Sequence, residues 1–135
     1  MAGGIAALVL VFVPGTFTAR GSLTLSDTPD LAEYGGYGLS SQAISFTGSS
    51  CSGIGGYADL GVGSGVTIRD ANGTIVGVGE ITDSEDVQPV CVFTFTVHDV
   101  PSGEGPYTVE ISHRGKVTVT EQALADGTAA LSIGN

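Results

Sequence analysis

The chain contains two cysteines, Cys51 and Cys91, and each lies at or beside a stretch that reads as a β-strand. The surrounding sequence is rich in glycine, threonine and valine and contains a single lysine. One cysteine pair in a small β-rich chain is typical of a domain with one disulfide, formed in an oxidising compartment. Such a bridge would contribute about 4 kcal/mol through loop closure. The pattern predicts a Cys51–Cys91 disulfide in a secreted or surface-exposed protein, with two unrelated buried thiols as the alternative.

Length and charge narrow the class of protein further. A chain of 135 residues is expected to form one domain with one core. Fourteen acidic residues face four basic ones, for a formal net charge of −10. A surface of this charge repels phosphate backbones and anionic lipid headgroups. Nucleic acid is therefore not expected to be a partner.

The N-terminal segment, residues 1–19, is apolar and carries no charged side chain. Its centre, from Ile5 to Val13, includes Leu8, Leu10 and Phe12. A transmembrane helix needs about 20 apolar residues, so this run is short for one. It also lacks the basic start and the cleavage site of a regular signal peptide. Three interpretations remain: an uncleaved membrane anchor, a contact segment that packs on a neighbouring subunit and makes a homo-oligomer, or a degenerate signal peptide.

The remainder, residues 20–135, reads as β almost throughout. Asp70-Ala71-Asn72-Gly73 predicts a hairpin turn, because Asn-Gly tolerates the positive φ that such a turn requires. Seven or eight short strands at this spacing favour an antiparallel, immunoglobulin-like β-sandwich. The predicted strands cover residues 21–26, 43–47, 66–69, 74–81, 90–98, 107–111, 117–120 and 130–133, with loops at 26–38, 49–65 and 82–86 and one helical turn at 121–125 capped by Thr120.

The alternation within two strands predicts the core. In the strand from Val90 to His98, one face carries a cysteine, two phenylalanines and a valine, and the other face carries Val92, threonines and His98. In the strand from Tyr107 to Ile111 the odd-numbered positions are apolar. The predicted core positions are Cys91, Phe93, Phe95, Val97, Tyr107, Val109 and Ile111.

A run of about 50 residues resembles prealbumin-like (transthyretin-like) sandwiches, such as carboxypeptidase regulatory domains and collagen-adhesin B-type repeats. The resemblance lies in residues 66–76 with their D-x-N-G turn, the F-x-F strand at 91–95, Val100-Pro101, and Y-x-V-x-I at 107–111. It implies a prealbumin-like sandwich and no particular chemistry.

A second resemblance spans most of the chain after Thr18. Residues 20–25, 51–60 and 110–115 look like segments of uncharacterised actinobacterial envelope proteins. Those proteins carry one N-terminal membrane segment and one extracytoplasmic domain. The resemblance implies a location in the cell envelope. The apolar start of this chain is shorter than the usual anchor of those proteins.

Catalysis has weak support in the sequence. A nucleophile needs a base and an orienting acid, and the chain has only His98 and His113 as histidines. Ser64 lies between two glycines but lacks the strand-to-helix elbow of hydrolases. Structural roles are favoured for these residues, and no enzymatic activity is expected.

Calcium is the one cofactor for which residues are available. Asp70 and Asn72 occupy the hairpin turn, and Asp83, Glu85 and Asp86 cluster further along. Calcium takes six to eight oxygen ligands, often from loops. The spacing matches no complete calcium motif, so these five residues are only candidate ligands and no other cofactor is expected.

Tyr34, Tyr37 and Tyr57 lie in glycine-rich loops. Loop tyrosines form recognition surfaces in some proteins and close the open end of a sandwich in others. Together these features predict a non-enzymatic, extracytoplasmic structural or interaction module of the cell envelope. The alternative is a subunit of an extracellular filament or virion whose apolar N-terminus packs into a neighbouring subunit.

Overall fold

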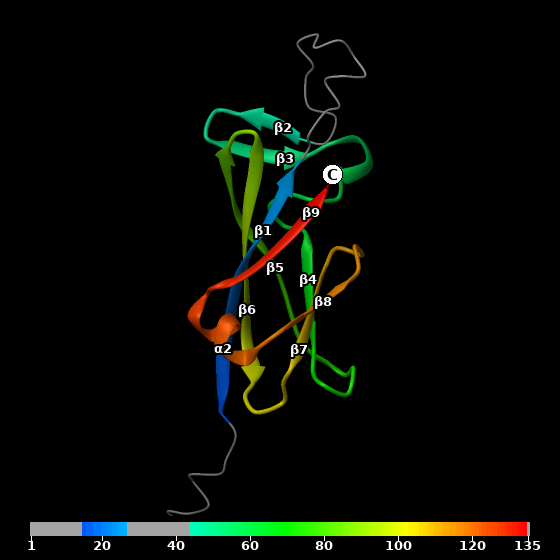
Figure 1. The fold of residues 1–135 in the computed structure, drawn as a ribbon, viewed down its shortest axis with the longest axis vertical. Helices are drawn as coiled ribbons and strands as arrows, with labels where there is room; N and C mark the ends of the chain where they lie inside the picture. Colours follow the sequence, from blue (N-terminus) through cyan, green and yellow to red (C-terminus); the bar gives the residue numbers. More distant parts are fainter. Residues whose placement is uncertain (1–14, 27–43, 135) are drawn as a thin grey trace, which may run out of the picture.

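A computed structural model describes residues 15–26 and 44–134, and this part of the chain consists mainly of β-strands (Figure 1). One short helix and one 3-10 turn accompany them. The elements are β1 (Thr16–Ser26), β2 (Ile44–Thr47), β3 (Ser50–Gly53), η1 (Gly55–Tyr57), β4 (Gly65–Arg69), β5 (Ile75–Val87), β6 (Val90–Pro101), β7 (Tyr107–Ile111), β8 (Lys116–Val119), α2 (Glu121–Asp126) and β9 (Ala129–Gly134).

Seven of these strands form one sheet, in the order β8-β7-β4-β5-β6-β1-β9, and β2 and β3 form a separate hairpin. The predicted sandwich was antiparallel throughout, and this is wrong for one strand pair, because β9 lies parallel to β1 from Gly21 to Ser26. Parallel neighbours need a crossover connection rather than a tight turn. The chain that leaves β8 forms α2 against β1 and then enters β9 in the same direction as β1. The sheet is therefore mixed.

β5 joins the two halves of the sheet. Its first half pairs with β4 and its second half with β6, and Glu80 lies opposite both Gly65 and Thr96. The register shifts between Ile81 and Asp83, as at a β-bulge. The acidic stretch 82–86, predicted as a loop, is therefore strand. Pairing with β6 holds this stretch along one edge, while the side chains of Asp83 and Glu85 are exposed.

Two glycines let the sheet curl at this strand. A Cβ atom at Gly79 would lie 2.3 Å from the carbonyl oxygen of Thr96, and one at Gly77 would lie 2.9 Å from Val97 Cγ1. The side chains of Val97 and Val100 fill the space that side chains at these positions would need. The close approach of β5 and β6 therefore requires glycine.

The core follows the predicted alternation. All seven predicted core positions on β6 and β7 are buried, and Phe93, Phe95 and Tyr107 are fully so. On β1, Leu23 lies opposite Phe93 and Leu25 lies opposite Cys91, and both leucines are buried. β6 thus lies at the centre of the core, between β1 and β5.

Helix α2 forms as predicted from its cap. The Thr120 side chain accepts a hydrogen bond from the backbone N–H of Ala123, and Gly127 ends the helix in the left-handed conformation. Leu124 is fully buried and fastens the helix to the sheet.

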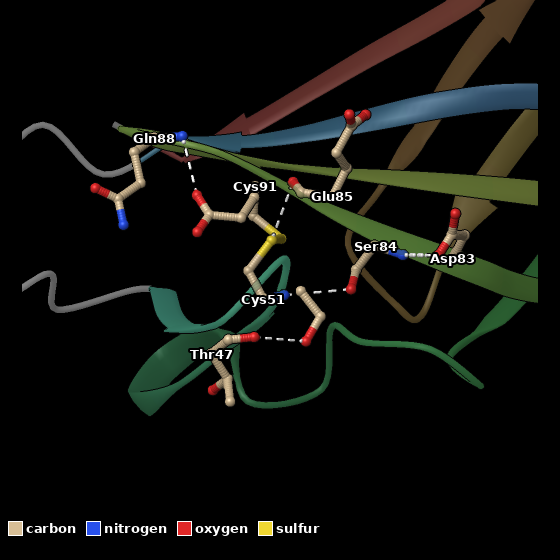
Figure 2. The surroundings of a disulfide bond; sticks show 9 residues. Thr47, Cys51, Asp83, Ser84, Glu85, Gln88 and Cys91 are labelled. Atoms are coloured by element: carbon tan, nitrogen blue, oxygen red, sulfur yellow. Dashed lines mark hydrogen bonds between the residues drawn. A yellow bond between two sulfur atoms is a disulfide. The ribbon is translucent and has the colours of Figure 1, made fainter.

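The predicted disulfide is present. Cys51 of β3 is bonded to Cys91 of β6, which attaches the β2–β3 hairpin across one end of the long strands (Figures 1 and 2). Two backbone contacts add to the attachment: the N–H of Cys51 donates to Ser84 Oγ, and the N–H of Asp86 donates to the carbonyl of Ser49. β3 itself was predicted as part of a long loop, because four residues with two serines and a glycine show no strand pattern.

Strand β1 begins before the predicted domain boundary. Thr16 to Ala19 belong to the sheet, and Ala19 is fully buried opposite Val97. The sheet therefore includes the last residues of the segment 1–19. The apolar residues Ile5, Leu8, Leu10 and Phe12 lie outside the described residues.

Replacing Gly79 tests the close approach of β5 to β6. We expect Gly79→Ala to lower the free energy of unfolding by about 1–3 kcal/mol, because the added methyl group overlaps backbone. Urea denaturation monitored by circular dichroism measures the change. Gly65→Ala is the matched control, since a Cβ there meets nothing within 4 Å. Equal stabilities of the two variants would show that β5 does not approach β6 as closely at Gly79 as described.

Removing the disulfide tests its contribution to stability. We expect the double variant Cys51→Ala, Cys91→Ala to lose up to about 4 kcal/mol, since the bridge closes a loop across 40 residues of sequence. Urea denaturation gives the difference from the oxidised protein. Thiol titration in denaturant should find no free thiol in wild-type protein before reduction and two after it. Two free thiols in the purified, unreduced protein would show that Cys51 and Cys91 are not joined in a disulfide.

Candidate functional site

The end strands of the large sheet, β8 and β9, border one hollow. Each has a single hydrogen-bonded neighbour in the described sheet, β7 and β1 respectively. Residues of β1, β7, β8 and β9 nevertheless line a common hollow of about 60 Å³. Leu23 and Ile111 contribute to the lining from the inner strands, and Val117, Leu131 and Ile133 from the two end strands. The sheet therefore curls until its ends approach, and the seam between them is not hydrogen-bonded in the described sheet.

Val117 shows that the inner face is incompletely covered at this seam. Residues directly opposite each other on neighbouring strands share a face of the sheet. Val117 lies opposite Val109, which is fully buried, yet Val117 itself is 44% exposed. On the other side of the hollow, Leu131 is buried and Ile133 is partly exposed. An apolar strip that belongs to the core face thus reaches solvent between β8 and β9.

Arg114 holds the turn at one end of this hollow. Its Nε donates to Asp59 Oδ2 at 3.0 Å, and its Nη2 donates to Asp59 Oδ1 and to the carbonyl oxygen of Gly56. The guanidinium carbon also lies 4.6 Å from the centre of the Tyr57 ring. These contacts join the β7–β8 turn to the segment around η1. They fix the position from which β8 starts.

The ion pair changes the titration of both partners. The hydrogen bond from Arg114 lowers the pKa of Asp59 to about 2, against a smaller opposing effect of burial. The same contact raises the pKa of Arg114. Asp59 is therefore charged at neutral pH, where it is paired with Arg114.

A second ion pair crosses the outer face of the sheet. Arg69 of β4 and Glu110 of β7 are 2.6 Å apart, and this hydrogen bond lowers the pKa of Glu110. Two of the four basic side chains of the protein are thus paired with carboxylates inside the fold.

The loop between β6 and β7 is held by Tyr107. Its hydroxyl donates to the carbonyl oxygen of Pro101 and accepts from the N–H of Glu104, and burial raises the pKa of the hydroxyl. An open hollow of about 370 Å³ lies beside this loop. The Glu121 carboxylate on its wall accepts a hydrogen bond from the N–H of Gly103. The polar groups here therefore stabilise the loop.

The three residues considered for catalysis, Ser64, His98 and His113, lie in different elements of the described structure. The Ser64 hydroxyl donates to the carbonyl of Asp59 and accepts from the N–H of Gly61. His98 lies exposed near the end of β6, and His113 lies exposed in the β7–β8 turn. Ser64 stabilises its own loop.

The candidate calcium ligands lie in two separate places. Asp70 Oδ1 accepts the N–H groups of Asn72 and Thr74, so this carboxylate braces the β4–β5 turn. Asp83, Glu85 and Asp86 lie in the second half of β5. Asp83 accepts the backbone N–H of Ser84 (Figure 2), and Asp86 accepts the backbone N–H of Gln88. Among the described residues, no group of three or more histidine, cysteine or acidic side chains is placed to hold a metal ion.

Of the three loop tyrosines, the structure describes only Tyr57. Tyr57 is partly buried and stacks with Arg114 as part of the brace beside the hollow. Tyr34 and Tyr37 lie outside the described residues. In the described ranges, the structure contains no helix that is both long and apolar enough to span a membrane.

Comparisons with protein-family models, with curated proteins and with solved structures gave no match.

Sequence reasoning did not find the hollow between β8 and β9. The sequence predicts both bordering strands, at 117–120 and 130–133, but no local signal shows that they approach each other. The one available hint is Val117, an apolar residue in a strand whose partner Val109 is a predicted core position.

The Asp59–Arg114 pair predicts a pH-dependent contribution to stability. The pKa of Asp59 is lower in the folded protein, about 2, than its ordinary value of 3.8. Its contribution is therefore complete above about pH 4 and is lost as the pH falls toward 2. We expect Asp59→Asn to cost about 1 kcal/mol at pH 7 and progressively less below pH 4. Urea denaturation at pH 7, 4 and 2 measures this difference.

Glu85→Gln is the control for that series, because it removes the same charge from an exposed position on β5. It should change stability little at any pH. If Asp59→Asn costs as much at pH 2 as at pH 7, the ion pair does not carry the contribution assigned to it.

Proposed function

We propose that this protein is a non-catalytic structural or interaction module that works outside the cytoplasm, in the cell envelope, where the apolar segment before β1 holds it. The body is an immunoglobulin-like or prealbumin-like sandwich in which β9 is the parallel exception. The disulfide between Cys51 and Cys91 is the main observation that supports a location outside the cytoplasm, since such bonds persist in oxidising compartments.

The use of the polar side chains supports a non-catalytic role. Arg114 and Asp59 brace a turn, Tyr107 and Glu121 hold a loop, and Asp70 closes a hairpin. Catalytic groups need a substrate within reach of an acid, a base or a nucleophile. Each of these side chains is instead occupied by a contact within the fold.

A second candidate function is a subunit of an extracellular assembly, in which the apolar N-terminus packs into a neighbouring copy. The hollow between β8 and β9 favours it, because an apolar strip beside two end strands is a natural place for another chain to bind.

Protease treatment of intact cells of the source organism tests the first candidate. We expect the protein in intact cells to be cleaved by external protease, while a cytoplasmic marker stays whole. Alkylation before lysis should find both cysteines blocked from reaction, because they are joined in the disulfide. Cleavage only after lysis, together with two free thiols, would refute an extracytoplasmic location.

A shortened protein then tests the role of the N-terminal segment. A variant that begins at Gly15 keeps β1 whole, whereas one that begins at Arg20 would lose the buried Ala19. The Gly15 variant should keep the fold of the full-length protein and leave the membrane or assembly fraction after cell fractionation.

A further inference from the structure

The hollow between β8 and β9 has the features of an acceptor for an added β-strand. The outer edges of both strands are free of pairing within the described sheet, and such edges offer unpaired N–H and C=O groups. A strand that binds at a sheet edge gains backbone hydrogen bonds and places alternate side chains into pockets. The hollow holds about four water-sized groups, which matches one aliphatic side chain. Its lining includes the apolar side chains of Leu23, Ile111, Val117 and Leu131, together with Arg114 and Ser132.

We propose that residues 5–13 of a second copy of this chain bind here, as a strand added to the free edge of β9. The inference rests on the second candidate function above. These nine residues are all apolar, include neither glycine nor proline, and contain three valines and an isoleucine. They are also uncharged, so they can approach a body whose net charge of −10 repels other bodies.

Chain reach favours a second copy over the same chain. β9 runs beside β1 only from Gly21 onward, so the hollow begins about 17 Å along the strand from Thr16. Its outer edge lies two strand spacings from β1, about 10 Å sideways. Pro14 and Gly15 together span at most about 7 Å. A segment of the same chain would use several of its apolar residues to reach the hollow, while a neighbouring copy supplies all nine.

The start of β1, from which the donor segment leaves, and the acceptor edge of β9 lie toward opposite ends of the body. The donor segment precedes Thr16 at the start of β1, and β9 accompanies the second half of β1 toward the hairpin end (Figure 1). A contact between different surfaces of two copies is heterologous and builds an open chain unless the rotation closes a ring. The expected assembly is therefore a head-to-tail series of copies.

The test compares four purified, oxidised proteins by size-exclusion chromatography with light scattering, in a mild detergent and over a range of concentrations. They are the full-length protein, the variant that begins at Gly15, full-length Val117→Lys, and full-length Thr118→Lys. Val117 is 44% exposed and lines the hollow, so Val117→Lys places a charge in the acceptor without removing a fully buried side chain. Thr118 is exposed on the opposite face of β8 and is the matched control.

We expect the full-length protein and Thr118→Lys to form oligomers whose mass rises with concentration. The Gly15 variant lacks the donor and Val117→Lys lacks the acceptor, so each alone should be monomeric, with at least a tenfold loss in self-affinity. Mixed together, they should form a 1:1 dimer, because Val117→Lys still has a donor and the Gly15 variant still has an acceptor. Circular dichroism checks that both variants keep the β fold.

Three results would overturn the inference. The first is oligomerisation of Val117→Lys like wild type, and the second is the absence of a dimer in the mixture. The third is a full-length protein that is monomeric at every concentration. If that single copy needs detergent and the Gly15 variant does not, residues 1–14 are a membrane anchor. That result removes the strand acceptor and leaves the extracytoplasmic module standing.

Discussion

The burial of one face of β6 is the constraint on which the rest of the structure depends. This strand pairs with β1 on one side and with β5 on the other, and its inward side chains are fully buried. Gly21 lies opposite Phe95, and a Cβ there would lie 2.6 Å from the phenylalanine ring. On the other side, Gly77 and Gly79 make room for Val97. Glycines on the neighbouring strands thus leave room for the side chains of β6. Cys91 of β6 also forms the covalent link to the β2–β3 hairpin.

From this centre the sheet extends outward to its two end strands, whose backbone pairing is less complete than that of the interior. The interior strands other than β5 pair with a neighbour on each side, whereas β8 and β9 each have one partner in the described sheet. Arg114 fixes the turn before β8, and α2 fixes the chain before β9. Both strands that border the seam are therefore attached to other parts of the fold. Apolar side chains line part of the hollow because residues of the core face at the seam have no covering strand in the described sheet.

Several elements could be predicted because their signals are local. The buried positions of β6 and β7 follow from strict alternation, the β4–β5 turn from Asn72-Gly73, and the start of α2 from Thr120. The disulfide follows because the chain has only two cysteines. The acidic stretch 82–86 was predicted wrongly, since its composition resembles a loop while pairing with β6 holds it as strand. Of the candidate site, Val117 lay in a predicted strand, but its exposure could not be predicted.

The sequence by itself determined a β-rich body, one disulfide, the main buried positions of the core, and an uncharged apolar segment before the first strand. Each of these depends on residue types and on spacings of a few positions, which fix side-chain direction and turn geometry. Only the tertiary structure decided the parallel pairing of β1 with β9, the continuation of β5 from one half of the sheet to the other, and the hollow between β8 and β9. Those features arise between segments far apart in the chain, where strand order and curl determine which edges meet and which apolar side chains stay uncovered.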